Sequence, residues 1–209
     1  MTVWTLSSER GAGAHEVAQA LAEALEVPDA TEAVAVAVAG ALRMNVDELA
    51  QLEQRVSKPM QLWVLGATTV YGSAALVRSE MDRILSLREA TEHAFHQAAR
   101  LPCLVMGRAG FSILARHPHS YHIRLWAPIE WRAKRRAARE CIRLCVAREM
   151  LKREDRACMA YVRRMRGVDV RDPRHFHLVV NASRFRPEEI ADMIAIQTRP
   201  SRSNRSLSL

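Results

Sequence analysis

Short apolar runs alternate along the 209-residue chain with longer segments of helical periodicity. The apolar runs predict four buried strands, at Val3–Leu6, Pro102–Met106, Tyr121–Trp126 and His177–Val180. Apolar side chains three or four residues apart predict helices between and after the strands, at His15–Leu25, Glu32–Leu42, Asp47–Val56, Leu76–Ala99, Ala109–Ala115, Pro187–Ile196 and Ile129–Arg139. The last of these begins a basic helical region that runs to about Met165. Strands separated by helices favour an α/β fold with a parallel sheet that is covered on both faces.

The ends of several elements carry local signals. Asn45 is the expected cap of the helix that begins near Asp47, and Pro187 occupies the first turn of the last helix. Met60–Leu65 fits either a strand or a helix, and Gly66–Gly72 fits a turn or loop. The Ser- and Arg-rich residues 199–209 predict a disordered tail, which leaves residues 1–198 as a single domain.

Composition predicts a globular protein of the cytoplasm. Apolar residues make up 49% of the chain, enough for a sizeable core, yet we find no apolar run long enough to span a membrane. The N-terminus lacks the basic-then-apolar pattern of a secretory signal. The four cysteines form no CxxC pair, so we expect reduced thiols.

Positive charge is concentrated in one segment. The chain has a net charge of +8, whereas Arg132–Arg174 alone holds fifteen Lys or Arg and six Asp or Glu, a net +9 that leaves −1 for the rest. A segment of this kind favours a partner that carries several phosphates.

The segments that follow the first three strands are candidate binding loops, because ligands of parallel sheets bind beyond the carboxyl ends of the strands. They are Ser7–Ala14, Gly107–Gly110 and Ala127–Arg132. In the first of them, Gly11 and Gly13 precede a helix whose free N–H groups favour an anion. The pattern predicts a phosphate-binding loop, with a tight strand-to-helix turn as the alternative.

This loop departs from the common phosphate-binding pattern G-x-x-x-x-G-K-[ST]. With Gly13 as the last glycine, Ala14 stands at the lysine position and His15 at the hydroxyl position, and the leading glycine has no counterpart. Arg10 offers a positive charge to the loop, and the hydroxyls of Ser7 and Ser8 are close in sequence.

Four stretches together resemble the cytidylate kinase-like branch of the P-loop nucleoside monophosphate kinases. They are SSERGAGAHEVAQALAEAL, LPCLVMGRAGFSIL, HIRLWAPIEWRAKRR and KREDRACMAYVRRMRGVDVRDPRHFHLVVNASRFRPEEIADMI. The resemblance covers most of the chain and is loose only between residues 31 and 73. It implies a three-layer α/β/α P-loop NTPase fold with a central parallel sheet and a helical lid at about residues 139–166.

The resemblance also implies roles for individual residues. Loops of this branch often lack the lysine, and the implied ATP-binding residues here are Ser8, Arg10, Gly11, Ala12, Gly13, Ala14 and His15. Arg108 matches an arginine that contacts the monophosphate substrate, while Ala109 replaces the aspartate that helps to read cytidine. Arg132 matches a recurrent arginine after the third strand, and with Arg164 it completes the implied substrate-binding set.

The basic helical region resembles a lid whose arginines close over phosphates. Arg153 and Arg156 lie on one helical face, and Arg163 follows about two turns later. Asp155 is expected to orient an arginine or to hold metal-bound water, so these four are the candidate catalytic residues. The alternative is a solvated helix face paired with nearby carboxylates. A further group is expected at the surface, namely Arg135, Arg136, Arg139 and Arg143.

The resemblance implies an enzyme that transfers the γ-phosphate of ATP to a CMP-like nucleoside monophosphate, with Mg²⁺ bridging the phosphates. The missing lysine and Ala109 favour the alternative of a nucleotide-binding or regulatory protein that has lost efficient catalysis. Nucleic-acid binding through Arg132–Arg174 is a third hypothesis, disfavoured because aromatic residues are scarce there. The histidine clusters show no metal-ligand spacing, so no metal site of the protein itself is predicted, and the pattern leaves the oligomeric state open.

Overall fold

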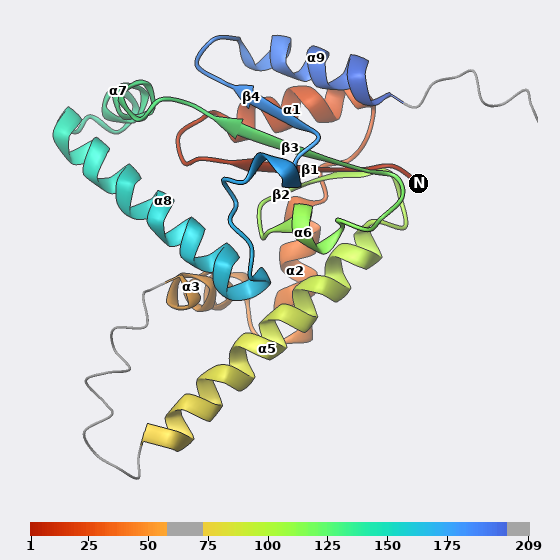
Figure 1. Cartoon of the computed structure of the whole chain (residues 1–209), viewed down its shortest axis with the longest axis vertical. Coiled ribbons are helices and arrows are strands. Elements are labelled where there is room, and N and C mark those ends of the chain that lie inside the picture. The colour runs from red at the N-terminus through yellow and green to blue at the C-terminus, as the bar shows by residue number, and fades with distance from the viewer. Residues whose placement is uncertain (58–72, 200–209) are drawn as a thin grey trace, which may run out of the picture.

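The computed structural model describes residues 1–57 and 73–199 and contains a four-stranded, all-parallel sheet (Figure 1). Its strand order is β2-β1-β3-β4. The strands are β1 (Val3–Ser8), β2 (Cys103–Met106), β3 (Ser120–Trp126) and β4 (Leu178–Asn181). Leu6 of β1 pairs with Met106 on one side and with Ile123 on the other, so the carboxyl ends of these strands meet at one edge. The predicted parallel α/β sheet is confirmed.

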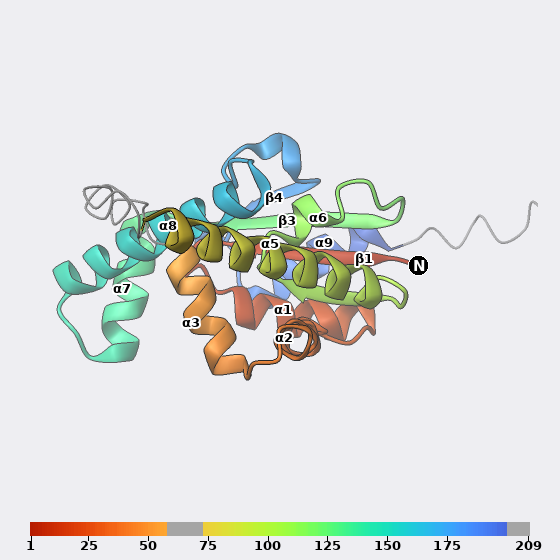
Figure 2. The same ribbon diagram turned by 90° about the horizontal axis from the view of Figure 1, so that it is seen from below.

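Helices cover both faces of the sheet, which gives the predicted three layers (Figure 1). One face is covered by α1 (Ala14–Leu25) and α9 (Pro187–Thr198). The other is covered by α2 (Thr31–Ala41), α3 (Val46–Val56), α5 (Ser73–Ala98) and α6 (Gly110–Ile113). Side chains alternate along β1: Trp4 and Leu6 pack with α1 and α9, whereas Val3 packs with Phe95 of α5. Seen from below, α5 runs across this second face and α3 lies beside α8 (Figure 2).

A helical hairpin extends beyond the sheet edge where β1 and β3 end (Figure 1). Its helices are α7 (Ile129–Glu140) and α8 (Leu144–Arg166), and they pack through a small core of Ala133, Ala147 and Leu151. The helix predicted at Ile129–Arg139 corresponds to α7, and the helical region that follows it to about Met165 corresponds to α8. Cys141 adopts a left-handed conformation (φ 53°) and ends α7, which allows the chain to reverse before α8.

Most other predicted boundaries differ from the structure by a few residues. Asn45 caps α3 as expected: its side chain accepts from the Glu48 N–H (2.9 Å) while the Glu48 carboxylate accepts from the Asn45 N–H (2.8 Å). The short helix expected at Ala109–Ala115 is only Gly110–Ile113, and the 3₁₀ turn Pro173–His175 has no counterpart among the predicted elements.

Several predictions lie outside the described residues. They concern Met60–Leu65, Gly66–Gly72 and residues 200–209 of the expected tail. Arg199 is described, and its N–H donates to the Ala195 carbonyl at the end of α9 (2.9 Å). Across the two described ranges, no helix combines the length and the apolar character needed to cross a bilayer.

Candidate nucleotide-binding site

The loop between β1 and α1 is built around two glycines in left-handed conformations. Gly11 has φ 81° and Gly13, the N-cap of α1, has φ 87°, a region that L side chains rarely adopt. The loop is tied to the sheet by the Glu9 N–H, which donates to the Leu125 carbonyl (3.1 Å), and it is closed by the Ala12 N–H on the Glu9 carbonyl (3.1 Å). Two glycines are therefore needed for the turn to form in this place.

Five backbone donors on either side of Ala12 and at the start of α1 have no protein acceptor in the described part of the chain. They are the N–H groups of Gly11, Gly13, Ala14, His15 and Glu16, and the first helical bond is from the Val17 N–H to the Gly13 carbonyl (3.1 Å). Free donors at the N-terminus of a helix attract an anion, because the helix dipole adds a partial positive charge there. The loop therefore has the chemistry of a phosphate site without a lysine.

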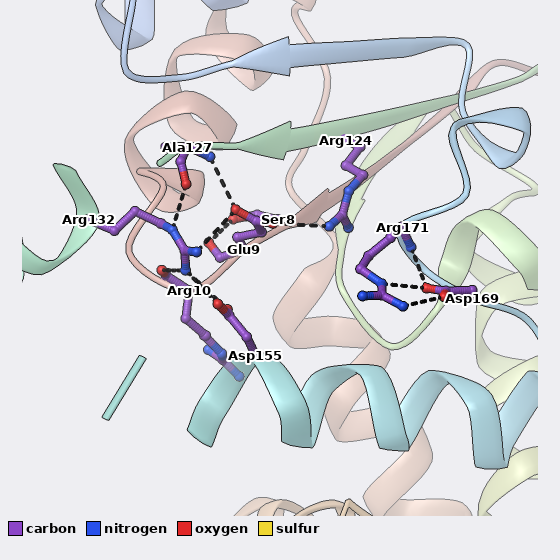
Figure 3. Close-up of polar contacts among 9 residues, drawn as sticks. All are labelled: Ser8, Glu9, Arg10, Arg124, Ala127, Arg132, Asp155, Asp169 and Arg171. Carbon is purple, nitrogen blue, oxygen red and sulfur yellow. Dashed lines mark hydrogen bonds and ion pairs between the residues drawn. The ribbon is translucent and has the colours of Figure 1, made fainter. Parts of the chain in front are cut away.

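A buried arginine joins this loop to the helical hairpin (Figure 3). Arg132 is 4% exposed, and its Nε donates to the Ala127 carbonyl (2.8 Å) while its Nη1 donates to the Arg10 carbonyl (3.0 Å). Nη1 also lies 2.9 Å from Asp155 Oδ2, and Nη2 lies 3.3 Å from Glu9 Oε2. These contacts of Arg132 are all with protein oxygens, so in this structure it holds the loop, the start of α7 and α8 together. Asp155, expected to organise the lid arginines, binds Arg132 in this structure.

The structure does not bring the other candidate lid arginines to the loop. Arg153 and Arg156 are exposed, and the Arg156 Nε donates to the Lys152 carbonyl one turn earlier (3.1 Å). Arg163 is also exposed, and its Nη2 lies 3.7 Å from Asp169 Oδ2. Arg164 instead donates to the Val56 carbonyl (2.9 Å), which links α8 to the end of α3.

Arg108 lies in the turn after β2 and faces α3. Its Nε is 2.8 Å from Glu53 Oε1 and its Nη2 is 3.4 Å from Oε2. Burial raises the pKa of the Glu53 carboxyl, and the Arg108 guanidinium opposes that shift. The buried Tyr161 hydroxyl has no hydrogen-bond partner in the described structure, and burial raises its pKa, to which the charge of Glu53 adds. Arg108, Glu53 and Tyr161 thus form a polar group between α3, α8 and the turn after β2.

Three charged residues near the loop were missing from the sequence-based candidates. Arg135, expected at the surface, places Nη1 3.1 Å from where a Cβ on Gly13 would lie, and its Nη2 is 2.9 Å from Glu16 Oε1. Glu9 binds both Arg132 and Arg124. Arg124 is a 7%-exposed cation inside the apolar strand β3, and a charge within a predicted buried strand is the signal that could have identified it.

The comparisons with known proteins identify the family. The model of the cytidylate kinase-like family matches residues 3–184. The chain belongs to the cytidylate kinase-like family. Membership in this family supports a nucleotide kinase-like role for the protein. A comparison with curated protein sequences finds no match.

Two solved structures share the fold of this cytidylate kinase-like protein. A crystal structure of an uncharacterized protein from Eubacterium ventriosum aligns with a TM-score of 0.67 at 18% identity, over 94% of this chain and 97% of the other. Shikimate kinase from Bacteroides thetaiotaomicron aligns with a TM-score of 0.50 at 14% identity, over the same shares of the two chains. At these identities the two structures establish the P-loop kinase-like fold alone.

Proposed function

We propose that this cytidylate kinase-like protein transfers the γ-phosphate of ATP to a CMP-like nucleoside monophosphate. The observation that carries the proposal is the set of unpaired N–H groups of Gly11, Gly13, Ala14, His15 and Glu16, at the sheet edge where the arginine-rich hairpin is anchored. Phosphoryl transfer depends mainly on positioning and charge neutralisation, and both need such donors.

The loop suits a triphosphate better than the cavity beside it. A cavity of about 400 Å³ runs along α1, but its lining includes the acidic Glu23 and Asp29, which would repel phosphates. At the loop itself the exposed side chain of Arg10 reaches toward α8 (Figure 3), and Arg135 adds a second cation beside Gly13. Arg10, together with Arg135, which is shared with Glu16, would offset part of the charge of ATP bound at these donors.

Mg²⁺ fits this site as a companion of the nucleotide. No group of three or more His, Cys, Asp or Glu among the described residues could hold a metal ion. Mg²⁺ commonly uses one or two protein oxygens and takes its other ligands from water and substrate phosphates. The Ser8 hydroxyl donates its proton to the Glu9 carbonyl (2.7 Å), so its oxygen lone pairs remain available as one such ligand. When bound, Mg²⁺ would neutralise charge on the phosphates.

In this proposal the acceptor phosphate binds Arg108. Because Arg108 is paired with Glu53 in this structure, the acceptor must share or replace that carboxylate. Arg153, Arg156 and Arg163 complete the charge neutralisation only after α8 moves, since they now face solvent. Asp155 holds Arg132 and so positions the hairpin for that movement.

The test is a coupled phosphotransfer assay with ATP and a panel of nucleoside monophosphates, with and without Mg²⁺. We expect Mg²⁺-dependent turnover, and for Arg108→Gln a loss of kcat/KM for the acceptor of about tenfold or more, since a charge-assisted bond is removed. Arg116→Gln, at an exposed arginine of the following turn, is the matched control and should match the native protein. Absence of turnover across the whole panel would contradict the proposal.

The second candidate is a nucleotide-binding or regulatory protein of the same fold without efficient catalysis. It is favoured by Ala14 at the lysine position, by the non-hydroxyl His15 and by the buried Ala109. A nucleotide that raises the melting temperature without any turnover would support this candidate.

A further inference from the structure

A cavity of about 260 Å³ lies at the carboxyl edge of the sheet, next to the first residue of the phosphate loop. It is bounded by β3, by the turn before β4, and by β4 itself. Its lining residues are Glu9, Arg124, Trp126, Arg171, Pro173 and Val179. Two guanidinium groups, an indole and a carboxylate therefore meet around one space.

Arg124 has few partners for a buried cation. The residue is 7% exposed, yet its described contacts are one long ion pair, with Nη2 3.5 Å from Glu9 Oε1, and the ring of Phe176 at 5.8 Å. Burial lowers the pKa of the Arg124 guanidinium, and the charge of Glu9 opposes that shift. A guanidinium presents several N–H donors in a planar fork, and the hydrogen bond described for Arg124 uses Nη2 alone. Arg124 thus has donor capacity that a ligand oxygen could fill.

Arg132, the other buried arginine bound to Glu9, has many more hydrogen-bond acceptors than Arg124. Arg132 bonds two carbonyls and two carboxylates, all within 3.3 Å. Glu9 is drawn toward the same side, because its Oε2 also accepts from the Ala127 N–H (3.2 Å). The Glu9 carboxylate therefore binds mainly Arg132 and Ala127. Its contact with Arg124 is the longest of the three, at 3.5 Å.

Arg171 lines the same cavity as Arg124, and its side chain lies near that of Arg124 (Figure 3). Its Nε and Nη2 bind Asp169 at 3.1 and 2.8 Å, which fixes the direction of the guanidinium, and no bond is described for its Nη1. Trp126, at 38% exposure, provides an apolar wall. Two guanidinium groups that line one cavity can both donate to the oxygens of one tetrahedral oxyanion.

We infer that this cavity binds a phosphate group, with Arg124 and Arg171 donating to its oxygens and Trp126 beside it. Under the proposed function, on which this assignment of the ligand rests, the phosphate belongs either to the acceptor or to the γ position of ATP. Arg124 and Arg171 lie outside the set of site residues that the sequence predicts. Arg124 adds a binding residue from within the sheet.

The chain provides a matched pair of variants at this cavity. Arg171 and Arg174 each bind the aspartate two residues earlier, at 2.8 and 2.7 Å, but only Arg171 lines the cavity. Titration calorimetry with inorganic phosphate, CMP and a non-hydrolysable ATP analogue should show about tenfold weaker binding of at least one probe in Arg171→Gln, the loss of one charge-assisted bond. Arg174→Gln should bind every probe as the native protein does.

Arg124→Gln should weaken the same probe at least as much, with its melting curve as the check on folding. Probe binding should also change tryptophan fluorescence, and Trp126→Phe should abolish that change. If Arg124→Gln does not fold, the Arg171 and Arg174 variants and the fluorescence change decide the matter. Weakening of CMP alone assigns the acceptor phosphate, and weakening of the ATP analogue alone assigns the γ-phosphate.

The inference is overturned if Arg171→Gln and any folded Arg124→Gln protein bind all three probes as Arg174→Gln does, even when phosphotransfer is intact. Conversely, weaker binding of inorganic phosphate to Arg171→Gln in a protein that shows no phosphotransfer keeps the cavity and removes the proposed function. The two failures are therefore distinguishable.

Discussion

Arg132 Nη1 lies 3.1 Å from Oδ1 and 2.9 Å from Oδ2 of Asp155, so one nitrogen of a buried guanidinium is shared by both oxygens of a carboxylate 23 residues later. The same arginine reaches the Arg10 carbonyl and the Glu9 carboxylate. This contact joins α7, α8 and the loop at one point, and the placement of the hairpin over the loop depends on it.

Removal of the Asp155 carboxylate should therefore destabilise the fold. Asp155→Ala leaves a buried guanidinium with fewer acceptors, and we expect a loss of about 1–3 kcal/mol in the free energy of unfolding, measured by urea denaturation. Glu149→Ala, at an exposed α8 carboxylate that binds Lys152, should change it by less than about 0.5 kcal/mol. Equal losses for the two variants would show that the Arg132 contact has no special weight.

A methyl group on Gly13 should damage the loop. The residue has φ 87°, and a Cβ there would lie 3.1 Å from Arg135 Nη1, so Gly13→Ala should cost about 1–2 kcal/mol of stability and weaken ATP binding. Gly40→Ala is the matched control, because nothing lies within 4 Å of its Cβ on the exposed face of α2, and it should stabilise by up to about 1 kcal/mol. Unchanged ATP affinity in a folded Gly13→Ala protein would count against this loop as the phosphate site.

Arg135 should contribute to nucleotide affinity although its position in the sequence suggests a surface role. Its guanidinium lies beside Gly13 and stacks over the Trp131 ring at 4.8 Å. Because the side chain is partly exposed, the effect is screened, and Arg135→Ala should weaken ATP binding by about threefold to fivefold in calorimetry. Arg139→Ala, one turn later and 70% exposed, should leave the affinity unchanged, and indistinguishable affinities would refute the role.

His122 should make the stability depend on pH. Burial, and next the charge of His177, lower the pKa of His122 to about 4 from 6.5, while Nδ1 lies 2.8 Å from Thr5 Oγ1. The unfolded chain therefore takes up a proton at a higher pH than the native state. The contribution of His122 to the free energy of unfolding is full above about pH 6.5 and falls by about 2 kcal/mol between about pH 7 and pH 4.5.

The corresponding variant is His122→Gln, which keeps a polar partner for Thr5 and has no ionisable group. Urea denaturation across this pH range should show a smaller loss for His122→Gln than for the native protein, whereas His119→Gln, at an exposed histidine, should follow the native curve. Parallel curves for all three proteins would contradict the assignment.

The sequence predicted the elements well where periodicity is local and less well where conformation depends on one residue. Val17 and Leu21 lie one turn apart on the buried face of α1, and that pattern is visible without tertiary information. The break at Cys141 depends on a left-handed residue that is not glycine, for which the sequence carries no warning.

Some residues of the candidate site could likewise be identified from the sequence, and others could not. Gly11 and Gly13 could be found because a positive φ constrains the residue type. The environments of Arg124 and Arg135 depend on partners far along the chain, Glu9 and Glu16, so their charge alone did not separate them from surface arginines. Arg153, Arg156 and Arg163 are candidates through family resemblance, and under the proposed function they would act only after a movement of α8.

The central claim is that the free amides of Gly11 and of residues 13–16 bind a triphosphate, and amide NMR during titration with Mg²⁺ and a non-hydrolysable ATP analogue tests it most directly. The account predicts saturable shifts of the Gly11, Gly13 and His15 N–H signals, at concentrations that match the calorimetric affinity. Binding of the analogue that leaves these signals unmoved, or no binding at all, would contradict it.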